Sequence, residues 1–568
     1  MKDGGKTVLY FIGALGVIWL ALMVAPIEGG VAGWIGELPM RFTRPWEIQW
    51  CEQSLTCIVL FLGLYAIGIG LYRTTRRKYR RREEYGSAQW GDVYRLCRKY
   101  RDGNSEKNRI LTQHMQMGLD GKKHRRNLNT LICGGSGSGK TRFYCKPNIL
   151  QGNSSYVILD PKGEILRDTG YCLLRRGYAI KVLNLINMQQ SDRYNPFRYL
   201  RTENDVIKLV TNLFKATTPQ KAVSNDPFWD TAAKVLLQAL MFLVWKEAIQ
   251  EEQNFATILE LLRYGQVRED DDQYISPLDE LFDWLESEKP DHIAVKYYRD
   301  YRTGSGKTLK SIQITLAARL EKFNLESVAE LTKEDDLELP MLGQRKMALF
   351  AIIPDNDTSF NFLVSVLYTQ LFQELFFLAD DRYHGALPVA VHCVMDEFAN
   401  VSLPEDFEKI LSVMRSRNVS VSIILQNLAQ LKALFEKQWE SIVGNCDEFL
   451  YLGGNEQSTH KYVSELLGKE TIDTNTYGRS SGRSGSYSTN YQMAGRELLT
   501  PDEIRKLDNR RAILLIRGEK PILDEKYDLM CHPYIQWSGD GHAPAYTHKR
   551  QESYAMATIQ IQGGEENE

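Results

Sequence analysis

An apolar run leads directly into a glycine-rich turn in the stretch Leu131-Ile132-Cys133-Gly134-Gly135-Ser136-Gly137-Ser138-Gly139-Lys140-Thr141. The stretch matches the phosphate-binding-loop pattern, in which a glycine and four further residues precede Gly-Lys-Thr. In such a loop, backbone N–H groups converge on phosphate oxygens at the start of a helix, and residues 142–150 can form that helix. We therefore expect a nucleotide to be bound by Gly134, Gly135, Ser136, Gly137, Ser138, Gly139, Lys140 and Thr141.

The last two residues of the loop have separate tasks. Lys140 would reach the β- and γ-phosphates of ATP as a point charge, and Thr141 would offer its hydroxyl to Mg²⁺. A second, shorter match occurs at residues 304–308, but Tyr301 stands where the first glycine is required. Polar and charged residues precede it, so no buried strand can lead into it. We reject that match as a nucleotide site and predict a basic surface loop.

Length and composition restrict the class of protein. With 568 residues the chain has room for about two to four domains and a large core. The net charge of −2 means that any contact with nucleic acid must come from local basic patches. Nine cysteines occur without a CxxC pair or a Cys/His cluster of zinc spacing. This pattern indicates a reduced, intracellular body without disulfides or a structural metal.

Two uncharged apolar runs, residues 7–27 and 53–72, precede the loop. Each is long enough to cross a hydrocarbon core of roughly 30 Å as a helix. Basic residues crowd positions 73–82, whereas the segment between the runs holds only Arg41 and Arg44 as positive groups. The positive-inside rule then predicts two spans in the cell membrane with both termini in the cytoplasm. A cleaved signal peptide is the alternative for the first run, but that run is longer than a signal's apolar region and a second run follows.

Apolar runs of strand length alternate with helical segments on either side of a long helical block. The block, residues 202–330, includes a helix over residues 228–245 that is apolar on most of its faces, so we expect it to be buried. We also expect its apolar run to be too short to span a bilayer. Alternating strands and helices indicate a parallel sheet covered on both faces. The predicted strands are residues 155–159, 178–185, 346–354, 389–398, 419–426, 449–453 and 512–516. We expect the strands at 449–453 and 512–516 to be the last in the chain.

Two carboxylates end one of these strands, at Asp396 and Glu397. Asp396 would hold Mg²⁺ through water or through Thr141. Glu397 would take a proton from the attacking water. Solvated carboxylates at a strand end are the alternative for an isolated Asp-Glu pair. The complete phosphate loop upstream favours the NTPase interpretation.

Polar residues flank the next predicted strand. Gln426 ends it, and this side chain either senses the γ-phosphate, as in RecA-like motors, or caps the following helix. Arg415 and Arg417 lie between a helix and the start of the strand, a place that can face a neighbouring subunit's nucleotide, although loop arginines are common. Further on, residues 474–495 are rich in Ser, Gly, Asn and Tyr and predict a flexible loop, and residues 563–568 predict a disordered polar tail.

With these motifs placed, the chain resembles the type IV secretion coupling proteins, the membrane ATPases of conjugative DNA transfer. Only the phosphate loop is decisive by itself, and the specificity lies in the order of the motifs behind a membrane hairpin. The matching residues are Gly86-Ser87-Ala88, Gly134 to Thr141 with Pro147, Asp160-Pro161-Lys162-Gly163-Glu164, Tyr194-Asn195-Pro196-Phe197, Asp226-Pro227-Phe228-Trp229, Asp396-Glu397-Phe398, Arg415-Ser416-Arg417, Gln426 through Gln430-Leu431, and Leu498-Leu499-Thr500-Pro501.

The resemblance implies an α/β fold: a RecA-like P-loop NTPase domain with an inserted all-α domain, preceded by a two-helix transmembrane hairpin. It implies a homo-hexameric ring that uses ATP and Mg²⁺. Lys140, Glu397 and Gln426 would be catalytic, with Arg415 acting from a neighbouring subunit in preference to Arg417, while Thr141 and Asp396 would hold the metal. The expected parts are a membrane hairpin and basic stem at 1–82, the nucleotide-binding domain at 83–201 and 331–540, the all-α domain at 202–330 and a polar tail at 541–568.

The resemblance also implies a function. Family members link a relaxase–DNA complex, the relaxosome, to the secretion channel and help drive single-stranded DNA through it, and their all-α domain contacts that complex. The implied partners are the relaxase, DNA bound without sequence specificity, the channel components and the membrane. An ATP-regulated receptor that recruits the substrate without pumping is the alternative, since it needs the same motifs. A septal DNA pump is less favoured, because such pumps usually carry more spans and a C-terminal DNA-reading domain.

Overall fold

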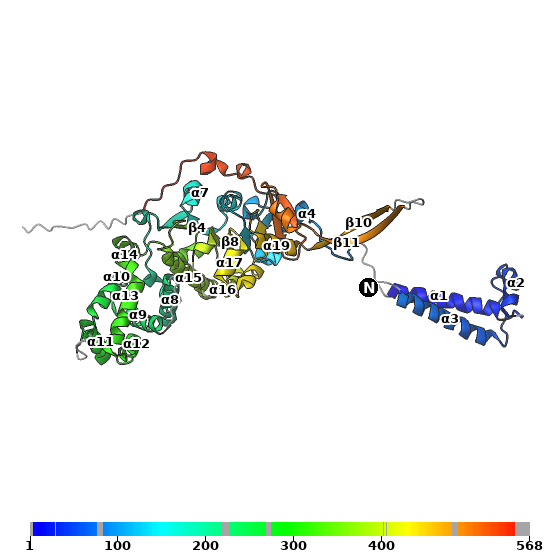
Figure 1. The fold of residues 1–568 in the computed structure, drawn as a ribbon, viewed down its shortest axis with the longest axis horizontal. Helices are drawn as coiled ribbons and strands as arrows, with labels where there is room; N and C mark the ends of the chain where they lie inside the picture. The colour runs from blue at the N-terminus through cyan, green and yellow to red at the C-terminus, as the bar shows by residue number, and fades with distance from the viewer. Residues whose placement is uncertain are drawn as a thin grey trace, which may run out of the picture. The chain divides into compact units, whose positions relative to one another are not determined.

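The computed structural model describes residues 4–28, 30–75, 83–218, 227–268, 274–401, 403–404, 406–479 and 487–550. The chain divides into two compact units. One unit consists of Met1–Gly86 and Thr471–Ala494, and the other of Ser87–Glu470 and Gly495–Glu568. Figure 1 labels some of the elements of both.

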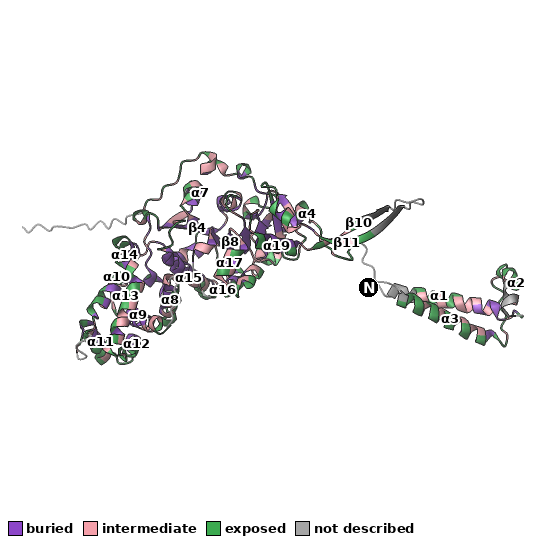
Figure 2. Ribbon diagram, in the orientation of Figure 1, coloured by how far each residue is buried: buried purple, intermediate pink, exposed green. Residues whose placement is uncertain are grey.

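Apolar helices dominate the first unit. They are α1 (Gly4–Val24), α2 (Gly30–Phe42) and α3 (Ser54–Thr75), of which α1 and α3 lie side by side (Figure 1). The Tyr65 hydroxyl on α3 donates to the Tyr10 carbonyl at 3.1 Å. Residues Ser54–Thr74 form a candidate membrane span with a mean hydropathy of 2.2, and only 6% of it is buried (Figure 2). Leu9–Val24 forms a shorter apolar helix, and most of the predicted basic cluster, residues 76–82, lies outside the described residues.

Two further helices are long and apolar enough to cross a membrane, but they lie in the second unit. They are α9 (Pro227–Glu247) and the helix that begins with α15 (Asn361–Phe377), and they are 56% and 78% buried within the fold. The prediction that the helix over residues 228–245 is buried is confirmed. The separate expectation that its apolar run is too short to span a bilayer is wrong, because this helix is long and apolar enough to do so. Burial against protein is what identifies it as a core helix.

A nine-stranded sheet forms the centre of the second unit, in the order β13-β12-β9-β3-β8-β7-β4-β6-β5. The seven strands from β9 to β5 are parallel, whereas β12 runs antiparallel to both β9 and β13. The strands are β3 (Thr130–Cys133), β4 (Ser155–Pro161), β5 (Ala179–Asn184), β6 (Met347–Ile353), β7 (Val391–Met395), β8 (Val419–Leu425), β9 (Glu448–Tyr451), β12 (Arg511–Ile516) and β13 (Ile522–Glu525).

This sheet differs from the prediction at one edge. It is mixed rather than parallel, and β13 follows the strand that we predicted to be the last. The segment between β12 and β13 is only residues 517–521, which is too short for the crossover that parallel strands need, so the two strands pair as a hairpin. The apolar part of β13 is too short to identify it as a strand in the sequence.

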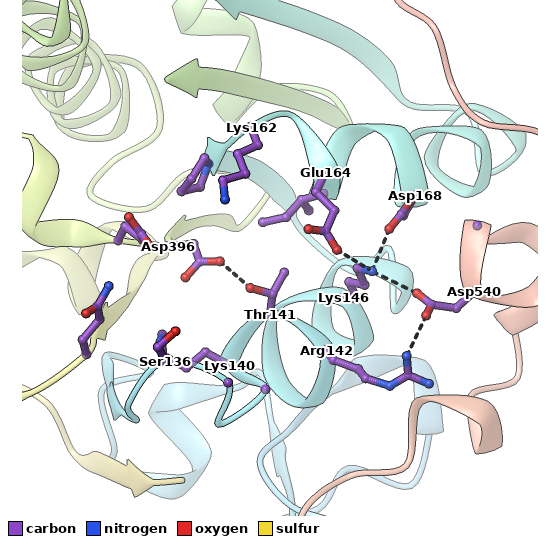
Figure 3. A pocket seen from close by; sticks show the side chains of 17 residues that line it. Ser136, Lys140, Thr141, Arg142, Lys146, Lys162, Glu164, Asp168, Asp396 and Asp540 are labelled. Carbon is purple, nitrogen blue, oxygen red and sulfur yellow. Dashed lines mark hydrogen bonds and ion pairs between the residues drawn. The ribbon is translucent and has the colours of Figure 1, made fainter. Parts of the chain in front are cut away.

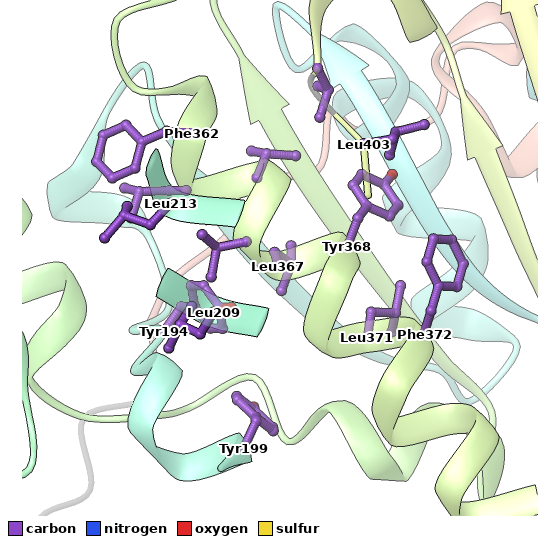
Figure 4. Packing of buried hydrophobic residues seen from close by; sticks show 14 of the residues in the cluster. Tyr194, Tyr199, Leu209, Leu213, Phe362, Leu367, Tyr368, Leu371, Phe372 and Leu403 are labelled. Carbon is purple, nitrogen blue, oxygen red and sulfur yellow. The ribbon is translucent and has the colours of Figure 1, made fainter. Parts of the chain in front are cut away.

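Helices cover both faces of the sheet, because successive residues of each strand point to opposite sides. Leu131 and Cys133 belong to one buried cluster and Ile132 to another. The first cluster includes residues of α8 (Glu203–Thr217) and α15, which pack through Leu209, Leu213, Leu367 and Leu371 (Figure 4). The second includes residues of α6 (Lys146–Leu150) and α7 (Glu164–Arg175). Replacing one of these buried leucines by alanine should cost about 2–5 kcal/mol of stability.

The described residues between β5 and β6 contain helices and no strand. Besides α8 and α9 these helices are α10 (Phe255–Tyr264), α11 (Pro277–Glu288), α12 (Ile293–Arg302), α13 (Gly306–Leu320) and α14 (Glu326–Lys333). The rejected loop match is part of this block. Ser305 precedes α13 and residues 306–308 form its first turn, so the predicted surface loop is instead the start of a helix. The domain limits at 202 and 330 stay a prediction.

Shorter elements complete the second unit. One of them is α4 (Val93–Tyr100), which is followed by a strand pair, β1 (Asn108–Ile110) and β2 (Gln116–Gly118). The remaining helices are α5 (Gly121–His124), α16 (Phe407–Met414), α17 (Leu428–Leu434), α18 (Trp439–Gly444), α19 (Gln457–Leu467) and α20 (Pro501–Arg505).

The predicted flexible loop at residues 474–495 is instead largely a hairpin of β10 (Lys469–Arg479) and β11 (Tyr487–Glu497). Threonine and tyrosine recur along both strands and favour extended backbone. The serine and glycine content that suggested a loop is concentrated at residues 480–486, which lie outside the described residues. The Thr471 hydroxyl of β10 accepts hydrogen bonds from the backbone N–H groups of Tyr85 and Gly86 at 3.1 and 3.2 Å.

Candidate functional site

The glycine-rich loop leaves β3 at the carboxyl end of the parallel strands. Backbone bonds hold its start between two neighbouring segments: the Gly134 N–H donates to the Leu425 carbonyl at 3.0 Å, and the Gly135 N–H donates to the Gly453 carbonyl at 2.8 Å. Gly139 has φ of +81°, and a Cβ there would fall 2.3 Å from the Phe143 ring. A side chain at Gly139 would therefore be strained by its conformation and would require the Phe143 ring to move. The loop continues into a π-helical turn, Thr141–Cys145, and then into α6.

Lys140 and Thr141 lie where the sequence predicted. The Lys140 ammonium donates to the carbonyls of Gly134 and Gly135 at 2.9 and 3.3 Å, so its side chain folds back onto the start of the phosphate loop. The Thr141 hydroxyl donates to the Asp396 carboxylate at 2.7 Å (Figure 3). Asp396 is 5% exposed at the end of β7, and burial raises its pKa while the bond from Thr141 opposes that rise. The structure thus joins residues 255 positions apart into one oxygen-rich corner.

This corner fits a magnesium ion. A hydroxyl and a carboxylate are hard oxygen donors, and Mg²⁺ usually takes one or two protein ligands and completes its shell with water and phosphate oxygens. Among the described residues no group of three or more His, Cys, Asp or Glu side chains could hold a metal by itself. Such an ion would therefore depend on oxygens of a bound phosphate chain.

Glu397 follows Asp396 and lines the same cleft, which has a volume of about 540 Å³. Its backbone has φ of +55°, a left-handed conformation that costs a non-glycine residue on the order of 1 kcal/mol. The Asn400 side chain donates to the Glu397 carboxylate at 2.9 Å and fixes its direction. A strained backbone that is held in this way is typical of residues kept for function.

Gln426 also lines the cleft, at the end of β8. The sequence left open whether it caps the next helix. The cap of α17 is Asn427, whose side chain accepts from the Gln430 N–H at 3.1 Å. The side chain of Gln426 is therefore not used as that cap.

Arg415 lies at the opposite end of the same strand, in the turn between α16 and β8. A strand of seven residues is roughly 23 Å long, so Arg415 is remote from the cleft of its own chain. It donates to the Gly121 carbonyl at 3.3 Å and has no ion-pair partner among the described residues. Arg417, in contrast, pairs with Asp380 at 2.7 Å and lies over the Phe376 ring.

Three further polar residues lie beside the cleft that sequence reasoning had missed. Asp160 is fully buried at the end of β4, accepts from the Ile165 and Leu166 N–H groups at 3.1 and 2.7 Å, and so holds the start of α7. Burial raises the pKa of Asp160 to about 7. Lys146 on α6 and Asp540 meet at 3.0 Å although 394 positions separate them. The Asp-Pro pair at 160–161 was the only local signal, and it entered the sequence analysis only as part of the resemblance to the family.

The loop, the paired threonine and aspartate, and the order of the sheet together define an α/β protein of the P-loop NTPase class. The family model described as "Type IV secretory system Conjugative DNA transfer" matches residues 90–529. The chain belongs to this family, and the resemblance seen in the sequence is confirmed.

Individual relatives agree with this assignment. "Protein VirD4" of Rhizobium rhizogenes is 21% identical over 410 residues, which cover 69% of this chain but only 57% of that protein. The chain thus spans little more than half the length of that relative. "Conjugal transfer protein TraG" of Escherichia coli is 23% identical over 517 residues, which cover 84% of this chain and 78% of that protein.

Solved structures support the fold. The plasmid coupling protein TrwB in complex with ADP and Mg²⁺ matches 78% of this chain and 96% of its own with a TM-score of 0.56 at 16% identity. A trigonal form of the conjugative coupling protein TrwBdeltaN70 in complex with sulphate gives a TM-score of 0.58, also at 16% identity, over 78% of this chain and 95% of its own. The predicted α/β fold class is confirmed.

Proposed function

We propose that this chain is a membrane-bound ATPase that couples a relaxase–DNA complex to a type IV secretion channel and helps drive single-stranded DNA transfer. The observation that carries this proposal is the 2.7 Å contact between Thr141 and Asp396, which closes a phosphate-binding loop against a strand-end carboxylate in a chain of this family. The solved relative TrwB binds ADP and Mg²⁺.

Each side chain of the cleft would have its own role in ATP hydrolysis. Mg²⁺, when bound, would neutralise charge on the β- and γ-phosphates. Thr141 and Asp396 would hold the ion, and Lys140 would exchange the Gly134 and Gly135 carbonyls for phosphate oxygens. Glu397, turned toward the cleft, would accept a proton from the attacking water. Gln426 would contact the γ-phosphate.

A ring of identical subunits completes the site. Arg415 is about a strand's length from its own cleft and lacks a carboxylate partner among the described residues. It is therefore placed to contact the nucleotide of a neighbouring copy. We therefore include a homo-hexamer in the proposal, with the relaxase, DNA bound without sequence specificity and the channel components as partners.

Two spans would hold this ring in the cell membrane with both termini in the cytoplasm. For the full chain with Cys51, Cys57 and Cys531 replaced by serine, we expect a cysteine introduced at Met40 to react with a membrane-impermeant maleimide on intact cells. A cysteine introduced at Gln89 should react only after lysis, because residue 89 follows the second span and the basic stem. The reverse labelling pattern would contradict this orientation.

ATP turnover with and without DNA separates a pump from a receptor. For the full chain in nanodiscs, we expect single-stranded DNA to raise ATP turnover several-fold, since a translocating motor couples each cycle to its substrate. Lys140→Ala is the control and should show no turnover with or without DNA. Turnover that DNA leaves unchanged, together with tight relaxase binding, would favour the ATP-regulated receptor instead.

A further inference from the structure

The segment after β13, residues 526–550, runs back across α7 as a strap (Figure 1). It contains three short 3-10 turns, Leu529–Cys531, Ile535–Trp537 and Gly539–Gly541. Its first residue lies beneath the phosphate loop: the Lys526 ammonium donates to the Ser138 carbonyl at 2.9 Å and lies over the Phe143 ring. Burial lowers the pKa of Lys526 to about 8. The strap therefore begins in direct contact with the loop.

Aromatic contacts then fix the strap on α7. The Arg176 guanidinium lies 4.2 Å from the centre of the Tyr534 ring, and Arg175 lies 5.2 Å from that of Trp537. Leu529 is fully buried in a small cluster with Leu150 and Cys172. This part of the strap is a fixed support for the residues beyond Trp537.

Asp540 reaches from the strap into the nucleotide cleft (Figure 3). One carboxylate oxygen accepts from Arg142 at 3.0 Å, and the other accepts from Lys146 at 3.0 Å. Lys146 also donates to Asp168 at 2.7 Å and lies within 3.5 Å of Glu164. The strap thus adds a third carboxylate to this wall of the cleft.

The far end of the strap contacts the helical block. The Tyr546 N–H donates to the Arg167 carbonyl at 3.0 Å, and His548 lies 3.1 Å from the Asp192 carboxylate. Arg550 contacts Glu330 of α14 at 3.4 Å. Residues 541–550, which we expected to begin the polar tail, are therefore packed onto the fold, and residues 551–568 lie outside the described residues. One segment connects the phosphate loop, the cleft and the last helix of the block.

The two cations that hold Asp540 differ in their freedom. The Lys146 side chain is 6% exposed and has two other carboxylates, whereas the Arg142 side chain is 50% exposed. Arg142 directly follows Thr141 in the first turn after the loop, where phosphate oxygens of a bound nucleotide approach. The phosphate chain and Asp540 therefore compete for Arg142. They also repel each other, because both are negative and share one cleft.

We propose that the strap is a latch that nucleotide opens: Asp540 holds Arg142 while the cleft is empty, and the phosphate chain of an entering nucleotide takes Arg142 and releases this part of the strap. This inference rests on the proposed nucleotide binding at Lys140 and Thr141. Because coupling between two events is reciprocal, a load on the helical block that pulls the strap from the cleft raises nucleotide affinity. The latch thus couples nucleotide occupancy of the cleft to the strap, whose far end contacts α14.

Asp540→Asn tests the latch, because it removes the negative charge and keeps the size of the side chain. For the full chain in nanodiscs, we expect the Kd for Mg²⁺-ADP, measured by calorimetry, to fall roughly 3- to 10-fold. Asp528→Asn makes the same change elsewhere on the strap, outside the cleft, and should leave the Kd unchanged. In hydrogen exchange, peptides covering residues 538–548 should exchange faster in the wild type once ADP is added, and should exchange fast in Asp540→Asn without it.

The outcomes separate the latch from the site itself. Unchanged or weaker ADP binding in Asp540→Asn, or slower exchange of residues 538–548 with ADP, overturns the latch. If Lys140→Ala loses binding in the same experiment, the nucleotide site stands and the latch alone fails. Undetectable ADP binding by the wild-type chain overturns both.

Discussion

Glu397→Gln is expected to bind ATP with near-normal affinity and to hydrolyse it at least roughly 10²-fold more slowly than the wild type. Glutamine keeps the hydrogen bond from Asn400, so the shape of the cleft should persist. It cannot accept a proton, however, and the attacking water then lacks its base. Steady-state phosphate release and equilibrium binding of ATP, both measured on the full chain, separate these two effects.

Two companion variants make this result specific. Lys140→Ala should lose binding as well as turnover, because it removes the ammonium that now bonds to the Gly134 and Gly135 carbonyls. Glu436→Gln makes the matched change at an exposed position outside the cleft and should retain full activity. Near-normal turnover in either Glu397→Gln or Lys140→Ala would contradict the assigned site.

Arg415→Ala is expected to bind ATP normally and to lose roughly 10³- to 10⁵-fold in turnover, the effect of an arginine supplied from a neighbouring subunit. The reason is geometric: Arg415 and Gln426 lie at opposite ends of β8, so the arginine cannot reach the cleft of its own chain. Arg415→Lys should recover little, since an ammonium lacks the forked donors of a guanidinium. Turnover at saturating ATP measures this loss.

Mixing two variants identifies which arginine acts on the nucleotide of a neighbouring subunit. Subunits carrying Arg415→Ala and subunits carrying Lys140→Ala are each inactive alone, but a mixed interface pairs an intact cleft with an intact arginine and should restore part of the activity. Arg417→Ala is the matched control and should keep turnover, because Arg417 is already paired with Asp380. Full turnover in Arg415→Ala, or complete loss in Arg417→Ala, would mean that the wrong arginine was chosen.

Local patterns were enough to predict the centre of the site. Thr141 and Asp396 are 255 positions apart, yet each ends or follows a buried parallel strand, and the carboxyl ends of such strands meet at one edge of the sheet. The same reasoning placed Glu397 and Gln426 beside the cleft. Their backbone details, such as the left-handed conformation of Glu397, have no signal in the sequence.

Other parts of the structure depend on contacts that no local pattern records. The antiparallel edge formed by β12 and β13 follows from a short connection, and the β10–β11 hairpin is hidden by a composition typical of loops. The contact of Asp540 with Arg142 joins residues 398 positions apart through side chains that belong to no motif. Long-range ion pairs of this kind become visible only when the chain is folded.

The frequency of conjugative transfer shows most directly whether ATP hydrolysis at this cleft drives DNA transfer. Donor cells lacking the native gene would be complemented with the wild type, Glu397→Gln or Glu436→Gln, with equal amounts of each protein confirmed in the membrane fraction. We expect Glu397→Gln to transfer no better than the uncomplemented donor and Glu436→Gln to match the wild type. Transfer by Glu397→Gln at the wild-type frequency would contradict this expectation.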